Sequence, residues 1–589
     1  MSRRNVSRST VSAGTPSARR VLAGVAAAVA LLISGCAPMI PTDGPVGTSD
    51  PDTQEGSSYL LEPQSPVPGS EPSQLIDDFL QAGVGPQDDY AVAREYLTPA
   101  AAREWSPGER TVVYSSTPEI LPEGENSYSV QFPVESVIDA DGIRTMVPPN
   151  TSEAVDFTVE EFEGEWRISG VPDGKFLALP EFQQVYQPHT LYFYNSDQTY
   201  AVPDERWFVN MPGRMPAALV EAVLEGPAPY LEPAVTSAFP QGSELRLSSV
   251  PMEGRTAVVD FTSGPVSSAS PEEQRLMEHQ LSLALTGLSS VSDVEITVDQ
   301  QELEALEDDG EEELDILAGE QITVRDTQIG LDGDELVRTR GNDMLSISDL
   351  PDLSDIEPQQ PAVANADPDT FAVLNGEADE LYHIRPGRAP DQVLEGEGLT
   401  RPSMDNYGWT WTASNPEEGA TIHASAYDES LETMSADISA DWLEGRSITS
   451  LRIAQDGARA AMVLDDGGDR TLYVAGVIRD SAGTPQGLGQ PMRMETIPGI
   501  EEVRWGDDAL VVWANFDEGS DDPEAMQIEL ARFNGSREEL HGPILGLVNV
   551  SAGEGQGHVW AEAQGDQQLP VGDRWQIQRL EALDLAYPG

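Results

Sequence analysis

The stretch "MDNYGWTW" at residues 404–411 begins a repeat that decides the fold of the C-terminal part of this 589-residue chain. It recurs as "IAQDGARA" at 453–460 and as "WGDDALVV" at 505–512. The three copies share an aspartate at a spacing of 51 residues (456 − 405 and 507 − 456): Asp405, Asp456 and Asp507. Each copy reads strand, Asp/Gly turn, strand. A period of about 50 built from short strands is typical of a β-propeller, whose blades bury their faces against one another.

The propeller is predicted to occupy residues 346–589. At ~40–50 residues per blade, these roughly 240 residues correspond to five or six blades. The aspartates and glycines of the repeat supply the tight hairpin conformation. We therefore assign them a structural role and no chemistry.

A small α+β unit is predicted at 71–180. Apolar residues recur at helical spacing over 75–80, and strand-like runs follow, with Asp/Glu-Gly pairs at 141–142 and 163–164 where hairpins turn. Helices followed by a curled antiparallel sheet resemble an NTF2-like cone. No cluster of His, Asp and Tyr marks a catalytic site in this unit, and Trp105 is expected in its core.

A second α+β unit is predicted at 188–300. It opens with the alternating strand "TLYFYN" at 190–195, and a helix over about 215–224 ends at a Gly-Pro pair. A longer helix begins at Pro271 and has one apolar face. The whole run resembles a GerMN domain, which occurs in proteins of spore germination and the cell envelope. That family has no established catalytic residues, so the resemblance assigns none here.

An acidic linker or insertion is expected at 301–345, between the second unit and the propeller. Residues 302–315 contain nine acidic residues. Their spacing lacks the ligand pattern of an EF-hand loop, so we predict a solvated segment and no cation site.

The only cysteine of the chain, Cys36, lies behind an export signal. Residues 1–20 are basic and polar, and 21–33 form an apolar run that is shorter than the ~20 residues a bilayer-spanning helix needs. The following "ISGC" resembles the bacterial lipobox, which implies removal of a 1–35 signal peptide by cleavage between Gly35 and Cys36. The resemblance further implies that Cys36 carries a diacylglyceryl group on its sulfur and an N-acyl chain such as palmitate.

Residues 36–70 are predicted to be a lipidated, proline-rich tether. Several acyl chains on one residue anchor a protein stably, since each buried methylene contributes ~0.8 kcal/mol. We therefore expect an exported protein at the outer face of the cytoplasmic membrane. As a flexible coil, the tether has a root-mean-square length of roughly 30 Å, which sets the distance of the globular part from the lipid. The pairs Arg3-Arg4 and Arg19-Arg20 leave a twin-arginine export route open, although the pattern that usually surrounds such a pair is missing.

The charge of the chain argues against nucleic acid as a partner. The formal net charge is −69, from 33 basic and 102 acidic residues. Removal of the signal peptide, which holds five arginines and no acid, makes it −74 (33 − 5 − 102). Such a chain repels phosphate backbones. A single cysteine also permits no internal disulfide and no thiolate metal site.

The sequence contains no catalytic motif that we could identify. Nucleophile elbows, H-E-x-x-H, P-loops and metal-spaced histidine pairs are absent from it. The histidines are scattered over separate units: His189, His279, His383, His423, His541 and His558. We predict a protein that is not an enzyme and has no catalytic residues, cofactor or metal.

The order of these features resembles one family. A lipobox followed by "APMIPTDGPV", a GerMN unit, and a propeller carrying "LTRPSMDNYGWTW", "ITSLRIAQDGARAAMV" and "LYVAGVIRD" together resemble the actinobacterial lipoprotein LpqB family across essentially the whole mature chain. The resemblance implies binding to the extracytoplasmic region of the MtrB sensor histidine kinase. It also implies modulation of the MtrA/MtrB two-component system, which influences cell-wall metabolism and division. The alternative is a protein that binds or hydrolyses cell-wall glycans with a pocket in the propeller or the NTF2-like unit.

Overall fold

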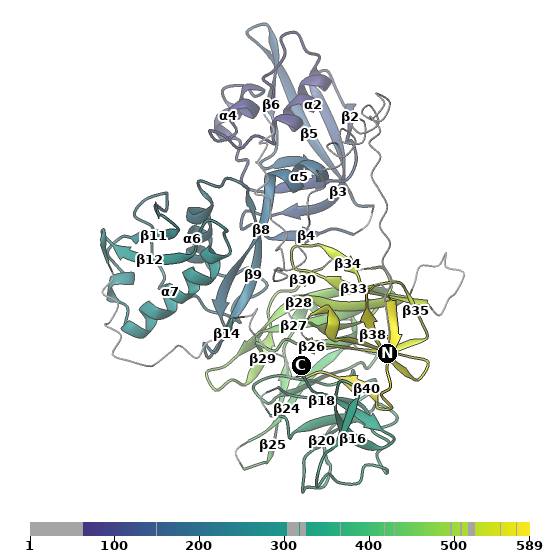
Figure 1. Cartoon of the computed structure of the whole chain (residues 1–589). Coiled ribbons are helices and arrows are strands. Elements are labelled where there is room, and N and C mark those ends of the chain that lie inside the picture. Colours follow the sequence, from purple (N-terminus) through teal and green to yellow (C-terminus); the bar gives the residue numbers. More distant parts are fainter. Residues whose placement is uncertain are drawn as a thin grey trace, which may run out of the picture. The chain divides into compact units, whose positions relative to one another are not determined.

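The computed structural model describes residues 63–589 apart from short gaps (Figure 1). The gaps are 149, 303–316, 319–325, 366, 418, 429, 444, 495–496, 507–508, 516–524, 554 and 573. The predicted signal peptide, Cys36, most of the tether, most of the acidic run and Asp507 therefore lie outside the described residues. Residues 60–589 form one compact unit. None of the helices that the structure describes is long and apolar enough to cross a membrane.

The first unit combines short helices with a largely antiparallel sheet. Its helices are α2 (Pro72–Ala82), α3 (Ala91–Glu95) and α4 (Ala101–Glu104). Its strands are β1 (Thr111–Tyr114), β2 (Glu119–Pro122), β3 (Ser127–Ile138), β4 (Arg144–Met146), β5 (Ser152–Phe162), β6 (Glu165–Gly170) and β7 (Lys175–Ala178). They pair in the order β6-β5-β3-β1-β7, with β2 and β4 both on β3.

Helix α2 covers this sheet with its apolar face. Pro72 stands in its first turn, where the missing N–H would have no intrahelical partner. Leu75 and Phe79 are buried on one side of the helix, and the Phe79 ring lies 5.4 Å from that of Trp105 between centroids. Trp105 is buried in the core, as expected. The predicted α+β architecture is confirmed, and the likeness to an NTF2-like cone remains a prediction.

The second unit follows helix α5 (Leu179–Val185) and contains two small sheets. One sheet holds β8 (Tyr186–Tyr194), β9 (Tyr200–Val209) and β14 (Leu317–Ala318). The other holds β10 (Met252–Glu253), β11 (Thr256–Phe261), β12 (Asp293–Val298) and β13 (Gln301–Glu302). The predicted helices are found as α6 (Met215–Glu225) and α7 (Pro271–Thr286). Helix α7 begins with a capping box, in which Ser270 and Glu273 bind each other's backbone N–H.

The propeller consists of six sheets among the described residues. The first holds β15 (Gln328–Asp332), β16 (Glu335–Arg340), β17 (Asp343–Ser346) and the last strand of the chain, β40 (Leu583–Ala586). The second holds β18 (Gln359–Val363), β19 (Phe371–Leu374), β20 (Glu380–Ile384) and β21 (Asp391–Glu395). The third holds β22 (Ser403–Met404), β23 (Thr410–Ser414), β24 (Thr421–Tyr427) and β25 (Thr433–Ile438).

The other three sheets follow the same plan. The fourth holds β26 (Ser447–Ile453), β27 (Arg459–Asp466), β28 (Asp469–Arg479), β29 (Pro485–Leu488) and β30 (Met492–Arg493). The fifth holds β31 (Ile500–Trp505), β32 (Leu510–Asn515), β33 (Ala525–Ala531), β34 (Arg537–Glu539) and β35 (Ile544–Leu545). The sixth holds β36 (Leu547–Ala552), β37 (Val559–Ala563), β38 (Asp566–Val571) and β39 (Arg574–Ile577).

The innermost strands of these sheets form a closed ring. They contact one another in the order β40, β18, β22, β26, β31, β36 and back to β40. The sheets are therefore the six blades of a β-propeller, which confirms the predicted fold. Of the two predicted blade numbers, five and six, the structure has six. The outer edges that the blades of such a ring keep are short and protected.

The ring is closed by two segments that are far apart in the sequence. Ile329 and Leu331 of β15 pair with Ala586 and Leu583 of β40. Residues 328–346 therefore belong to the first blade, and the prediction that the acidic linker reaches residue 345 is wrong. The 51-residue repeat does not reveal this blade, because its fourth strand comes from the opposite end of the propeller.

The second unit is docked on the fourth blade. The backbone N–H of Gly476 donates a hydrogen bond of 2.7 Å to the carbonyl oxygen of Tyr230. Asn195 Nδ2 donates to Tyr407 Oη at 2.9 Å, in the third blade. Ala234 shares a continuous buried core with Val474. The two units are thus packed together through their interiors as well as through polar contacts.

Candidate functional site

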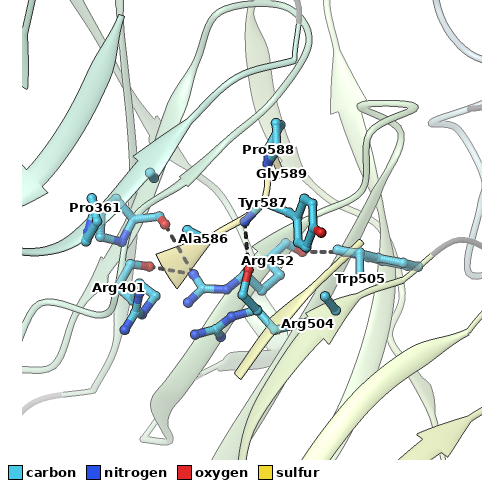
Figure 2. A pocket seen from close by; sticks show the side chains of 13 residues that line it. Pro361, Arg401, Arg452, Arg504, Trp505, Ala586, Tyr587, Pro588 and Gly589 are labelled. Carbon is cyan, nitrogen blue, oxygen red and sulfur yellow. Dashed lines mark hydrogen bonds between the residues drawn. The ribbon is translucent and has the colours of Figure 1, made fainter. Parts of the chain in front are cut away.

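The inner strands of the propeller converge on a small cavity, which Figure 2 shows from close by. Its lining comes from β18, β26, β31 and β36, from the residues just before β22, and from β40 with the segment after it. The centre of a water molecule has about 20 Å³ of room in it. One water needs ~10–15 Å³ by the same measure, so the cavity holds a small group and no ring.

Three of the residues that line the cavity are arginines from successive blades. Arg401 precedes β22, Arg452 lies in β26 and Arg504 lies in β31. Their exposed fractions are only 8%, 3% and 7%. Arg452 and Arg504 extend their guanidinium groups toward the same side of the cavity in Figure 2, where Arg401 also lies. We call these three residues the channel arginines.

The channel arginine Arg401 is only partly satisfied. Its Nη2 donates to Oδ1 of Asp584 in a close ion pair. Its Nε and Nη1 atoms are buried and have no hydrogen-bond partner among the described residues. The other carboxylate oxygen of Asp584 already accepts from the backbone N–H of Gln360. Two N–H donor atoms of Arg401 therefore remain available.

The channel arginine Arg452 is held by its neighbour's backbone. Its Nη1 donates to the carbonyl oxygens of Arg401 at 2.7 Å and Pro402 at 3.3 Å. Its Nη2 has no hydrogen-bond partner in the described part of the chain. The Oε2 atom of Glu502 lies 3.9 Å from that nitrogen, too far for a hydrogen bond.

The channel arginine Arg504 is the best satisfied of the three. Its Nη1 donates to Oε2 of Glu502 at 2.7 Å, and its Nη2 donates to Oδ1 of Asn549 at 3.3 Å. Asn549 in turn donates to the carbonyl oxygen of Leu585 at 2.9 Å. Both terminal nitrogens of the Arg504 guanidinium group are therefore held by hydrogen bonds.

Burial and mutual repulsion act on the charges of this cluster. Burial, with the nearby Arg504 and Arg401, lowers the pKa of Arg452 well below its usual value. Burial also lowers the pKa of Arg504 to about 10, although Glu502 opposes the change. For Glu502, burial alone would raise the pKa, but the arginines bring it below its usual value. Guanidinium groups stay protonated at neutral pH even so, so the cluster keeps three buried cations.

Such a cluster can bind an anion and offers little else. Guanidinium groups present N–H donors in a planar fork that matches carboxylate and phosphate oxygens. Metal binding has no support elsewhere in the described residues, where no group of three or more His, Cys, Asp or Glu side chains could hold an ion.

The structure places the predicted site residues as follows. Gly35 and Cys36 lie outside the described residues, so lipidation and cleavage remain predictions. The six histidines lie in different elements and are not brought together. His423, for example, contacts Ser414 and Asp437 within its own blade.

The repeat aspartates that the structure describes have the predicted structural role. Asp405 is fully buried, and its Oδ1 accepts from the backbone N–H groups of Tyr407 and Trp409, both at 2.9 Å. Asp456 is also fully buried and accepts from the N–H of Ala458 at 2.9 Å. Each carboxylate therefore stabilises its own hairpin turn.

Sequence reasoning missed the channel arginines, although the sequence carries a signal for them. Arg401 and Arg452 each stand four residues before a repeat aspartate, Asp405 and Asp456, and Arg504 stands three residues before Asp507. The arginines are 51 and 52 residues apart (452 − 401 and 504 − 452). An arginine that recurs with the blade period is expected at equivalent positions in successive blades.

Family models match all three units of the chain. The model for the lipoprotein LpqB N-terminal domain matches residues 65–183. The model described as sporulation and spore germination matches 190–304. The model for the lipoprotein LpqB β-propeller domain matches 334–578, which includes part of the first blade.

Whole-length relatives are found among actinobacterial lipoproteins. Lipoprotein LpqB of Thermobifida fusca (strain YX) is 25% identical, and the match covers 97% of this chain and 99% of that protein. Lipoprotein LpqB of Streptomyces coelicolor is 26% identical, over 95% of this chain and 96% of that protein. Among solved structures, the first GerMN domain of the sporulation protein GerM from Bacillus subtilis is 20% identical with a TM-score of 0.18. That match covers 22% of this chain and 96% of the solved domain.

Proposed function

Because the chain belongs to the lipoprotein LpqB family, we propose that it is a lipid-anchored protein at the outer face of the cytoplasmic membrane that binds and modulates a sensor histidine kinase. The kinase we propose is MtrB of the MtrA/MtrB two-component system, with effects on cell-wall metabolism and division. The observation that carries the proposal is the similarity to LpqB lipoproteins over 95–97% of this chain.

The proposed anchor is Cys36, exposed as the new N-terminus by cleavage after Gly35. The lipobox-like "ISGC" supports this step, and so do the relatives, which are lipoproteins by name. With a net charge of −74 after cleavage, the body is repelled by anionic headgroups. The anchor, rather than a charged face, would then hold the protein at the membrane.

The packing of the units supports a role in presenting a fixed surface. The second unit and the propeller share buried core residues, among them Ala234 and Val474. Units joined in this way move together, because separating them would expose apolar surface to water. A binding protein can shift a kinase between two states only by binding one of them more tightly. A stiff surface is suited to that discrimination because little ordering is required on binding.

Binding or hydrolysis of cell-wall glycans has less support. The propeller cavity has about 20 Å³ of room for a water-sized centre, which excludes a sugar ring. A larger cavity, with about 230 Å³ of room for a water-sized centre, lies beside β9 and α6 in the second unit and not in the propeller or the first unit.

Chemical crosslinking of intact cells, followed by affinity capture of the tagged full chain, tests the proposed partner. We expect the kinase among the crosslinked proteins, with the crosslinks on its extracytoplasmic region. The Cys36→Ala variant, expressed to the same level, should capture much less kinase because it is not held at the membrane. Repeated capture of other envelope proteins without the kinase would refute the partner.

A further inference from the structure

We propose that the channel arginines form a binding site for a small oxyanion, that is, a free phosphate or carboxylate ion or the corresponding group at the end of a ligand. The site lies inside the propeller and does not depend on the kinase partner proposed above. It rests on the cavity geometry, the unpartnered donors and the local charge balance.

The first argument is the presence of buried N–H donors that nothing in the described structure satisfies. They are Nε and Nη1 of Arg401 and Nη2 of Arg452. Both side chains are more than nine-tenths buried, with exposed fractions of 8% and 3%. Buried polar groups in native proteins are nearly always hydrogen-bonded, and an unsatisfied one commonly marks a bound ion or water. Both arginines line the same cavity.

The second argument is the charge balance. Three guanidinium groups are bound by two carboxylates: Asp584 pairs with Arg401, and Oε2 of Glu502 pairs with Arg504 while lying 3.9 Å from Arg452. A third carboxylate, Glu562, is held by other groups: its Oε2 accepts from the backbone N–H of Asp584 at 2.6 Å and from Nε2 of Gln567 at 3.1 Å. At the channel arginines, three guanidinium groups therefore share two ion-paired carboxylates, an arrangement that favours an anion over a cation.

The third argument is that the donors are already held in place. The Nη1 atom of Arg452 is fixed on the carbonyl oxygen of Arg401 at 2.7 Å. Asn549 fixes Arg504, and Asp584 fixes Arg401. Side chains that are ordered before binding lose little entropy when the ligand enters.

The size of the cavity limits the ligand. Room of about 20 Å³ for a water-sized centre suits one compact group whose oxygens accept hydrogen bonds from the free N–H groups. A ring or an oligosaccharide is too large for it. Carboxylate and phosphate both meet this requirement, because each offers two oxygens to a guanidinium fork.

Isothermal titration calorimetry on the full chain in a maltoside detergent tests the site. Inorganic phosphate and acetate are titrated separately, at an ionic strength kept constant with sodium chloride. We expect saturable binding of at least one of the two ions, and the ion that binds identifies the class of ligand. The variant Arg452→Met should bind it about tenfold more weakly or not at all. The matched control is Arg340→Met, at a side chain that is 65% exposed and paired with Asp326; it should bind like the wild type.

Arg452→Met should fold, because a buried charge with incomplete partners is replaced by an apolar chain of similar length. If it does not, Arg452→Lys takes its place, since it keeps the charge and loses the guanidinium fork. Failure of the wild type to bind either ion would overturn the proposal and assign the free donors to water. Equal binding by the wild type and a folded Arg452 variant would also overturn it.

Discussion

Asp405 and Arg479 form a buried ion pair between the third and fourth blades, in which Nη2 of Arg479 lies 2.6 Å from Oδ2 of Asp405. The side chains are 0% and 2% exposed. The same guanidinium lies 4.2 Å from the ring centroid of Tyr407. The aspartate that defines the sequence repeat therefore also joins two blades.

Asp405→Asn should destabilise the propeller strongly. The substitution removes one charge and leaves the other buried without its counter-ion, which costs about 3–5 kcal/mol. Denaturant unfolding followed by tryptophan fluorescence measures the loss. The matched control is Asp437→Asn, because the Asp437 side chain is 90% exposed and its Oδ1 lies 3.2 Å from Nδ1 of His423. It should change the free energy of unfolding by less than about 1 kcal/mol. Equal effects of the two substitutions would contradict the role of the buried pair.

Gly476→Ala should weaken the docking of the second unit on the propeller. A Cβ atom at this position would lie 2.7 Å from Cβ of Ala234 and 3.0 Å from the carbonyl oxygen of Tyr230. Hydrogen exchange should therefore become faster at the amides around Tyr230 and Gly476. The control is Gly542→Ala, where a Cβ atom meets nothing within 4 Å, and exchange should be unchanged. If both variants exchange alike, the interface is not as tightly packed as described.

The stability of the propeller should decrease as the pH falls from about 6.5 towards 4, in part because of His383. Burial lowers the pKa of His383 to about 4, and Asp391 opposes and Arg385 assists the shift. Its Nε2 contacts Ser425 Oγ at 3.2 Å, and its Nδ1 has no hydrogen-bond partner among the described residues. The unfolded chain binds a proton near pH 6.5 and the folded chain does not, so acid favours unfolding.

The titration of His383 should lower the free energy of unfolding by on the order of 3 kcal/mol between about pH 6.5 and pH 4. Thermal unfolding of the wild type and His383→Gln at a series of pH values isolates it from the many carboxylates, whose contributions are shared by both proteins. The difference between the two proteins should change through this pH window. A constant difference would show that His383 does not titrate as described.

Cys36→Ala should release the protein from the membrane without unfolding its domains, since Cys36 lies outside all of the elements that the structure describes. The expected result is a shift from the membrane pellet to the soluble or secreted fraction, measured after a high-salt wash. The wild type should stay in the pellet because several acyl chains anchor stably. Normal processing and a membrane-bound variant would contradict lipidation.

The sequence predicted the parts of the fold that depend on local or periodic patterns. The aspartate repeat predicted the propeller, and the apolar spacing with Pro and Gly signals predicted helices α6 and α7. The first blade was missed because β40 pairs with β15 across more than 250 residues (583 − 332 = 251). No local sequence pattern predicts such a contact. The apolar alternation of β15 is short and follows the acidic run, so it was assigned to the linker.

The candidate site was harder to predict than the fold for a different reason. The spacing of Arg401, Arg452 and Arg504 is visible in the sequence, but arginines are mostly exposed in proteins. Only the closed ring shows that all three are buried at one cavity. The spacing also does not show which N–H groups of Arg401 and Arg452 stay free, because this depends on how the two side chains lie against Asp584 and Glu502.

Purified MtrB kinase in proteoliposomes provides the decisive test of whether the chain is a kinase-binding lipoprotein. Its autophosphorylation rate is measured with and without the lipidated full chain anchored on the side of the extracytoplasmic region. We expect a rate that changes with the amount of lipoprotein and reaches a plateau, since binding favours one kinase state. An unchanged rate, together with no detectable association in the same membranes, would contradict it.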